Sequence, residues 1–480
     1  MPRQFSRIQA ERALLPQGWR RDVSVELGDD GRIARIRIGD ADAALTPQGA
    51  AVRVETLVPA VSNLHSHSFQ LAFAGRTEGA DAVSPEQAGG QPPSFWSWRD
   101  VMYSWAARLE ADDIEAIAAL AFATMLESGY GSVCEFHYLH HDRSGHAYAD
   151  PAELSARIVT AAETAGIGLT LLPVLYSYGG LDQEPLKTSQ RRFGCTLEQF
   201  AELLAAASRH VGSGSRDGRC GVALHSLRAV SPQQLGALPQ LLGEVGVDAP
   251  VHLHVAEQPA EVEAVQAVLG ARPVAWLLDN APVGPNWCLV HATHVDPIEV
   301  RGLAASGATI GLCPVTEADL GDGVMPVRDL LDAGGRFGVG TDSNVRISLR
   351  EELRLLEYGQ RLVSHRRRAL ADRQHGTGES LLRHALSGGA AAAGRHCGAI
   401  EEGALADLVA LELTSPCYEG VADAQLLDAW LFAAPAHGVR EVWSAGRHVV
   451  QGGRHVRRPA IEGAAREALR RSEDRYRTGR

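Results

Sequence analysis

The stretch VPAVSNLHSH (residues 58–67) leads from a run of apolar and small residues into two histidines separated by one serine. The run has the length and composition of a buried strand. Alternate residues of a strand point to the same side, so His65 and His67 could reach one metal ion together. An HxH pair alone is a weak signal, because two structural histidines give the same pattern. Its meaning depends on what the other strand ends carry.

Apolar runs of this kind recur along the chain and alternate with helix-like segments such as DDIEAIAALAFATMLESG and PAELSARIVTAAETAG. The runs are VPAVSNLH, GSVCEFHY, GLTLLPVL, CGVALHS, PVHLHVAE, NWCLVHATH, GATIGLCP and GRFGVGTD. Strands that alternate with helices predict βαβ units and a parallel sheet. About eight units over this length predict an α/β fold, a TIM-like (β/α)8 barrel spanning residues 59–398.

Both ends of the chain contain short strand-like segments and turns without the helix-like segments that separate the central runs. VSVELGDDGRIARIRIG contains two alternating segments around Asp-Asp-Gly, which is a hairpin signal. Near the other end, ADLVALELTS and VREVWSAGRHVVQGGRHV are also strand-like. We expect residues 1–58 and 399–460 to form one small β-sandwich domain, and residues 461–480 to form a polar tail.

Composition excludes several classes of function. The net charge is −12 and no basic block is present, so we expect no nucleic-acid partner. Lys187 is the only lysine and lies in a loop-like stretch, which argues against a P-loop and against Schiff-base chemistry. The seven cysteines form no CxxC pair, as is typical of reduced thiols in a cytoplasmic protein. No signal peptide or membrane span is expected.

Metal-competent side chains end several of the predicted strands, in barrel order. Beside His65 and His67 they are His252, His254, His291 and Asp342. Neutral imidazoles with one carboxylate suit zinc, or iron or another divalent transition ion. His252 and His254 share one face of their strand, and the later residue lies nearer the barrel mouth, where active sites of this fold are found. We therefore expect His65, His67, His254 and Asp342 to bind one metal ion.

A hydrolytic site follows from this set. A bound metal lowers the pKa of its water towards neutrality. Asp342 could accept the proton of that water, and Glu257, three residues after His254, could move a proton to a leaving nitrogen. His291 could hydrogen-bond the water or the developing tetrahedral centre. The alternative for Glu257 is a helix N-terminal residue stabilised by the helix dipole.

These motifs resemble the amidohydrolase superfamily, in particular its single-metal deaminases and, most closely, the formimidoylglutamate deiminase family. The similar segments lie between residues 55 and 365 and include NLHSHSFQLAFAGRTE, SFWSWRDVMY, EFHYLHHD, HSLRAV, HVAEQ, WCLVHATH, GLCPVTEADLGDGVMP and GTDSNV. EFHYLHHD, HSLRAV and TEADLGDG together are more specific than any single metal motif. The resemblance implies one zinc ion on His65, His67, His254 and Asp342, with Glu257, His291 and Asp342 catalytic.

The same resemblance implies hydrolysis of a linear amidine, N-formimino-L-glutamate, to N-formyl-L-glutamate and ammonia in histidine degradation. Barrels of this type often pair, so we expect a homodimer, and the reduced cysteines favour a cytoplasmic location. The resemblance also implies substrate contacts at Gln70, Arg99, Tyr138, His225 and Arg228. Two arginines suit a substrate with two carboxylates, because a guanidinium binds a carboxylate through paired hydrogen bonds.

Two alternatives remain open at this point. Another deaminase of the superfamily, of guanine, adenosine or triazine type, would need an aromatic pocket and depend little on the arginines. A metal-binding barrel without catalysis would have no need of Glu257, His291 and Asp342 together. The chain also departs from the family pattern at Leu71, Arg76 and Asn344 and in a longer segment at 79–93, which bears on substrate fit near the mouth.

Overall fold

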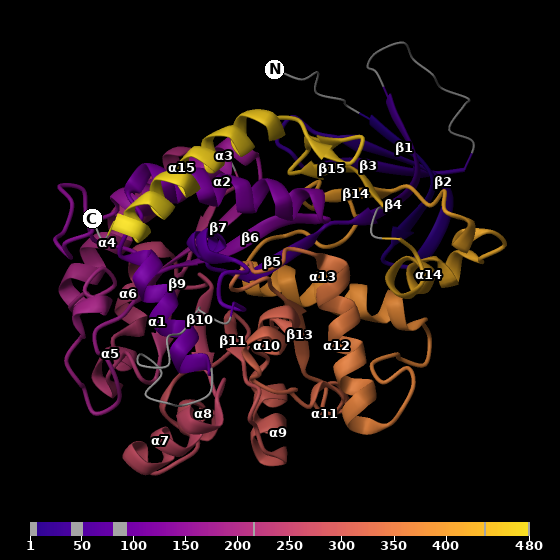
Figure 1. Ribbon diagram of the computed structural model, residues 1–480. Helices are drawn as coiled ribbons and strands as arrows, with labels where there is room; N and C mark the ends of the chain where they lie inside the picture. Colours follow the sequence, from indigo (N-terminus) through magenta and orange to yellow (C-terminus); the bar gives the residue numbers. More distant parts are fainter. Residues whose placement is uncertain (1–6, 40–50, 80–93, 215–216, 436–437, 479–480) are drawn as a thin grey trace.

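A computed structural model describes residues 7–39, 51–79, 94–214, 217–435 and 438–478. Eight parallel strands form the central barrel (Figure 1). In order they are β5 (Val61–Ser66), β6 (Tyr130–His137), β7 (Gly168–Leu175), β9 (Val222–Ser226), β10 (Val251–Val255), β11 (Trp287–His291), β12 (Thr309–Leu312) and β13 (Arg336–Val339), with the short β8 (Arg219–Cys220) paired to β7. The predicted barrel fold is confirmed.

The barrel closes between its first and last strands. The backbone amides of Thr341 and Asp342 donate to the carbonyl of His65 at 3.0 and 2.9 Å, and Ser66 bridges Asp342 in parallel register. Gly340 permits this approach, because a Cβ there would lie only 2.7 Å from the His65 carbonyl oxygen. Closure thus places Asp342, which follows β13, beside the histidines of β5.

Helices lie around the strands of the barrel, some of them in direct contact with the strands and others with neighbouring helices or turns. They are α1 (Phe95–Ala106), α2 (Ala111–Glu127), α3 (Glu153–Ala165), α4 (Leu197–Gly214), α5 (Pro232–Gly236), α6 (Leu238–Val245), α7 (Pro259–Leu269), α8 (Pro273–Asn280), α9 (Pro297–Ser306), α10 (Pro314–Leu320), α11 (Val327–Asp332), α12 (Leu349–Ser364) and α13 (Thr377–Ala393), with 3-10 turns η2 (Ser68–Phe73) and η3 (Thr188–Gln190). None of the helices in the described ranges has both the length and the apolar character that crossing a bilayer requires.

A second sheet draws its strands from both ends of the chain (Figure 1). Its order is β17 (Arg454–His455), β16 (Arg447–Gln451), β15 (Val439–Ser444), β14 (Leu408–Leu411), β4 (Ala51–Pro59), β1 (Arg7–Leu15), β2 (Gly18–Leu27) and β3 (Ile33–Ile38). It has its own buried cluster around Ile8, Val25 and Trp443. The turns η4 (Pro416–Tyr418) and η5 (Asp423–Gln425) and helix α14 (Leu426–Phe432) follow β14, and α15 (Arg458–Thr478) packs on α2. The boundaries at residues 59, 399 and 461 stay predictions.

Asp217 joins the barrel to this second sheet. Its carboxylate accepts from Arg395, which follows α13, and from Arg447 of β16, each at 2.7 Å. Although burial acts to raise it, the pKa of Asp217 is lowered to about 2 by these arginines. The ion pairs therefore contribute stability above the unfolded-state pKa of about 3.9, and that stability is lost as the pH falls through about 2.

Replacing Asp217 by asparagine is expected to destabilise the fold by about 3 kcal/mol at pH 7, because the buried Arg395 would lose the carboxylate that it hydrogen-bonds and would keep only Asp407, at 3.7 Å, as a countercharge. Urea unfolding at pH 7 measures this, and the difference between the two proteins should shrink below pH ~4. Asp248→Asn, at an exposed position, is the control. Equal stability of Asp217→Asn and the unaltered protein at pH 7 would contradict the assignment.

Candidate active site

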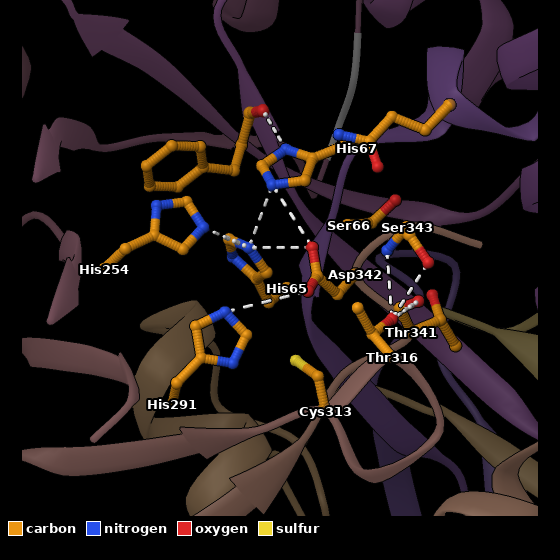
Figure 2. Close-up of polar contacts among 12 residues, drawn as sticks. His65, Ser66, His67, His254, His291, Cys313, Thr316, Thr341, Asp342 and Ser343 are labelled. Carbon is orange, nitrogen blue, oxygen red and sulfur yellow. Dashed lines mark hydrogen bonds and ion pairs between the residues drawn. The ribbon is translucent and has the colours of Figure 1, made fainter. Parts of the chain in front are cut away.

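Five buried side chains converge at the carboxyl ends of four barrel strands (Figure 2). His65 lies in β5 and His67 directly after it, His254 lies in β10, His291 ends β11, and Asp342 follows β13. Strands β10 and β11 are paired with Val255 opposite His291, so His254 and His291 lie on neighbouring strands. His291 and Asp342 adopt left-handed backbone conformations, with φ of 68° and 44°. Such conformations cost energy in non-glycine residues and are concentrated at functional sites.

Three imidazoles point their Nε2 atoms at a common centre. The Nε2 atom of His65 lies 3.2 Å from that of His67 and 2.9 Å from that of His254. Asp342 Oδ1 lies 3.5 and 3.3 Å from the Nε2 atoms of His65 and His67. One ligand atom of each of these four residues lies within 4.8 Å of all the others.

The surroundings of these rings fit a cation. Nδ1 of His67 donates to the Phe136 carbonyl and Nδ1 of His254 donates to the His225 carbonyl, both at 2.9 Å, which leaves the Nε2 lone pairs facing inwards. Burial lowers the pKa of His65 to about 3 and also lowers the pKa of His67, so these rings are neutral at pH 7. Facing lone pairs repel unless a proton or a metal ion lies between them. The donor set suits a divalent transition ion.

His252 lies outside this group. Its Nε2 donates to the carbonyl of Ala392 in α13 at 2.9 Å. Its position is that of a structural histidine of the core.

A second set of polar side chains surrounds His291. The Nε2 atom of His291 lies 3.5 Å from Glu257 Oε1 and 3.7 Å from Asp342 Oδ2. Its Nδ1 atom lies 3.2 Å from Glu317 Oε1. Burial raises the pKa of the Glu257 carboxyl, while His291 and Arg228 oppose that rise. A carboxyl of raised pKa beside a metal group is suited to proton transfer near neutral pH. Glu257 lies directly before Gln258, the N-cap residue of α7, and its catalytic role stays a prediction.

All five predicted substrate contacts line the pocket that opens over the metal group. They are Gln70, Arg99, Tyr138, His225 and Arg228. The Gln70 side-chain amide donates to the Tyr138 hydroxyl at 2.8 Å. The Arg99 guanidinium stacks 4.5 Å from the centre of the Trp96 ring.

The two arginines have unfilled hydrogen-bonding capacity. Nε of Arg99 and Nε of Arg228 are buried and have no hydrogen-bond partner. The Nη2 atom of Arg228 lies 4.0 Å from Glu257 Oε2, which is too far for a hydrogen bond. Guanidinium groups of this kind are available to an incoming anion.

Further residues of the pocket were missed by the sequence reasoning. Aromatic and apolar side chains complete its wall: Phe95, Trp98, Met102, Tyr103, Tyr176, Phe193 and Leu320. Glu317, which orients His291, and Asp322 beside it both fall in the motif TEADLGDG. The motif TEADLGDG was recognised as specific to the family, but nothing in the local sequence shows that its carboxylates lie beside His291.

Comparison with known proteins agrees with this geometry. A model of the amidohydrolase family matches residues 56–449, and a model described as formimidoylglutamate deiminase HutF, N-terminal domain, matches residues 5–50. A formimidoylglutamate deiminase of Pseudomonas aeruginosa is 48% identical over 453 residues, which cover 94% of this chain and 96% of that protein. The chain belongs to the formimidoylglutamate deiminase family of amidohydrolases. The predicted family is confirmed.

Solved structures give the same fold. A crystal structure of an amidohydrolase from Brucella melitensis has a TM-score of 0.88 at 42% identity and covers 97% of this chain and 99% of its own. An adenosine deaminase from Xanthomonas campestris, solved with bound zinc, has a TM-score of 0.77 at 22% identity, with 98% of each chain covered. At that identity the likeness concerns the fold.

Three of the positions that depart from the expected family pattern, Leu71, Arg76 and Asn344, are not among the residues that line the pocket. Asn344 is buried behind Asp342 and donates to the Ser66 hydroxyl at 3.2 Å. Arg76 stacks 4.6 Å from the centre of the Trp105 ring, and Leu71 packs on the core. Of the segment 79–93, residues 80–93 lie outside the described residues.

Proposed function

We propose that this amidohydrolase hydrolyses N-formimino-L-glutamate to N-formyl-L-glutamate and ammonia, in the degradation of histidine. One observation carries the proposal. A group of three histidines and one aspartate opens into a pocket that holds two arginines with unfilled hydrogen-bonding capacity. In a linear amidine with two carboxylates, the amidine carbon suits the histidine and aspartate group, and the two carboxylates suit the two arginines. The 48% identical relative from Pseudomonas aeruginosa, named formimidoylglutamate deiminase, supports the assignment.

The reaction adds water across a C=N bond and expels ammonia. His65, His67, His254 and Asp342 would hold one divalent ion. When bound, such an ion supplies a water acidic enough to attack the formimino carbon at neutral pH. Asp342 accepts the proton of the attacking water, and Glu257 delivers a proton to the departing nitrogen. His291, fixed by Glu317, hydrogen-bonds the tetrahedral centre as charge develops there.

The pocket wall would orient the substrate by its two acidic groups. Arg99 and Arg228 would bind the two carboxylates, and Tyr138, Gln70 and His225 would contact the chain between them. Burial lowers the pKa of His225 well below its ordinary value, so this ring is a neutral hydrogen-bonding group. We also propose zinc as the metal, a cytoplasmic location, a homodimeric assembly and a catalytic unit at residues 59–398.

Arg228→Ala is expected to raise KM about 10- to 100-fold, because one charge-assisted hydrogen-bonding group is worth about 1.5–3 kcal/mol. Steady-state ammonia release measures KM, and metal content should stay at one ion per chain. Arg366→Ala, at an exposed position on the barrel exterior, is the matched control. An unchanged KM for Arg228→Ala would remove this residue from the substrate site.

The products distinguish this reaction from cleavage of the other C–N bond. Mass spectrometry of the reaction mixture should show N-formyl-L-glutamate and ammonia in equal amounts. Formamide and glutamate would mean that the bond to the amino-acid nitrogen breaks, and the proposed roles of Glu257 and the arginines would then be wrong.

A further inference from the structure

A second group of metal-competent side chains adjoins the first. Glu257, His291 and Asp322 each place one ligand atom within 4.8 Å of the other two, and all three are buried. Their elements differ: Glu257 precedes α7, His291 ends β11 and Asp322 follows α10. Nothing in the proposed reaction uses Asp322.

The His291 ring is oriented as a metal ligand would be. Its Nδ1 lies 3.2 Å from Glu317 Oε1, and Glu317 Oε1 is itself held by the backbone amide of Cys313 at 3.0 Å. Nε2 therefore faces Glu257 and has no hydrogen-bond partner. A carboxylate on one ring nitrogen, with the other nitrogen left for the ion, is the usual support of metal-binding histidines.

Asp322 adds an unsatisfied oxygen on the far side of this group. The residue is 2% exposed. Its Oδ1 accepts a hydrogen bond from the Gln258 side chain, while its Oδ2 is buried without a partner. A buried carboxylate oxygen without a donor is costly, and a cation would relieve that cost.

Asp342 connects the two groups. Its Oδ1 lies 3.3 Å from Nε2 of His67, and its Oδ2 lies 3.7 Å from Nε2 of His291 (Figure 2). One carboxylate thus presents an oxygen to each group. Carboxylates bridge paired metal ions about 3.5–4 Å apart in hydrolytic sites.

We propose that Glu257, His291 and Asp322 form a second, weaker site for a divalent transition ion, which is bridged to the first site by Asp342 and inhibits the enzyme when it fills. Inhibition follows because an ion on Glu257 and His291 occupies the groups that move the proton and contact the tetrahedral centre. This consequence rests on the proposed function, whereas the binding itself does not. The second site has one imidazole where the first has three, so it fills only at excess metal.

Metal counting tests the site directly. Protein with one zinc ion per chain is dialysed against increasing zinc, and bound zinc is measured by atomic emission. The unaltered protein should take up a second ion per chain, and its ammonia release from N-formimino-L-glutamate should fall in parallel. Asp322→Asn should keep the first ion and bind the second at least tenfold more weakly. Asp319→Asn, an exposed carboxylate three residues away, is the control and should bind two.

Glu257→Gln gives the same test through another ligand, should Asp322→Asn fail to fold by circular dichroism. Uptake of only one zinc ion by the unaltered protein, or unchanged second-ion affinity in the folded variants, would overturn the site. A second ion that binds without slowing ammonia release would overturn the inhibitory role. Absence of ammonia release with one zinc bound would instead reject the proposed substrate and leave the metal count to decide this site.

Discussion

His65→Ala is expected to lose bound metal and ammonia release together. The Nε2 atom of His65 lies closest to the other ligands of the first group, 2.9 Å from His254 and 3.2 Å from His67. Its removal takes away one of the three imidazoles of the group. A catalytic ion contributes several kcal/mol, and each 1.36 kcal/mol is a factor of ten, so turnover should fall roughly 10³-fold or more.

The matched control is His252→Ala, which removes a buried histidine from the same barrel without touching the metal group. That variant should be less stable to urea and still contain one ion per chain. Metal content measured on both variants at equal folded fraction separates loss of a ligand from loss of packing. A His65→Ala protein that retains a full equivalent of metal would show that the first group is assigned wrongly.

Glu257→Gln is expected to lower kcat about 10²- to 10⁴-fold while metal content stays at one ion per chain. The glutamine keeps the shape of the side chain but cannot deliver a proton to the departing nitrogen. The measurement is single-turnover ammonia release together with metal analysis. The change should appear in kcat far more than in KM, because the proposed role of Glu257 is confined to the chemical step.

Glu263→Gln, at an exposed position of α7 a few residues away, controls for the loss of a nearby negative charge. It should leave kcat unchanged. Near-normal turnover by Glu257→Gln would show that Glu257 is not the proton donor. Another acidic residue of the pocket would then have to protonate the departing nitrogen.

The barrel could be predicted from the sequence because its signal is local and repeated. Each apolar run is followed by a helix-like segment, and polar side chains collect where the runs end. The prediction that His254, and not His252, is the metal ligand also followed from the direction of the strand, which places His254 nearer the mouth of the barrel. In the structure His254 faces His65, while His252 donates to the Ala392 carbonyl.

What the sequence did not reveal depends on contacts between distant segments. Glu317 and Asp322 follow a different strand from His291, and only the three-dimensional arrangement brings their carboxyl groups to that ring. Asp217 likewise looks like an ordinary loop aspartate until Arg395 and Arg447 are seen to enclose it. No periodicity or spacing rule encodes such contacts, because each depends on how the completed barrel packs.

The most direct test of the proposed function is ammonia release by the zinc-loaded protein, with one ion per chain, on a fixed panel. The panel contains N-formimino-L-glutamate, N-formimino-L-aspartate, guanine, adenosine and cytosine. The pocket with Arg99 and Arg228 predicts strong selectivity for the formimino acids, with N-formimino-L-glutamate the best substrate. Turnover of a nucleobase or nucleoside in preference to either formimino acid would contradict the account.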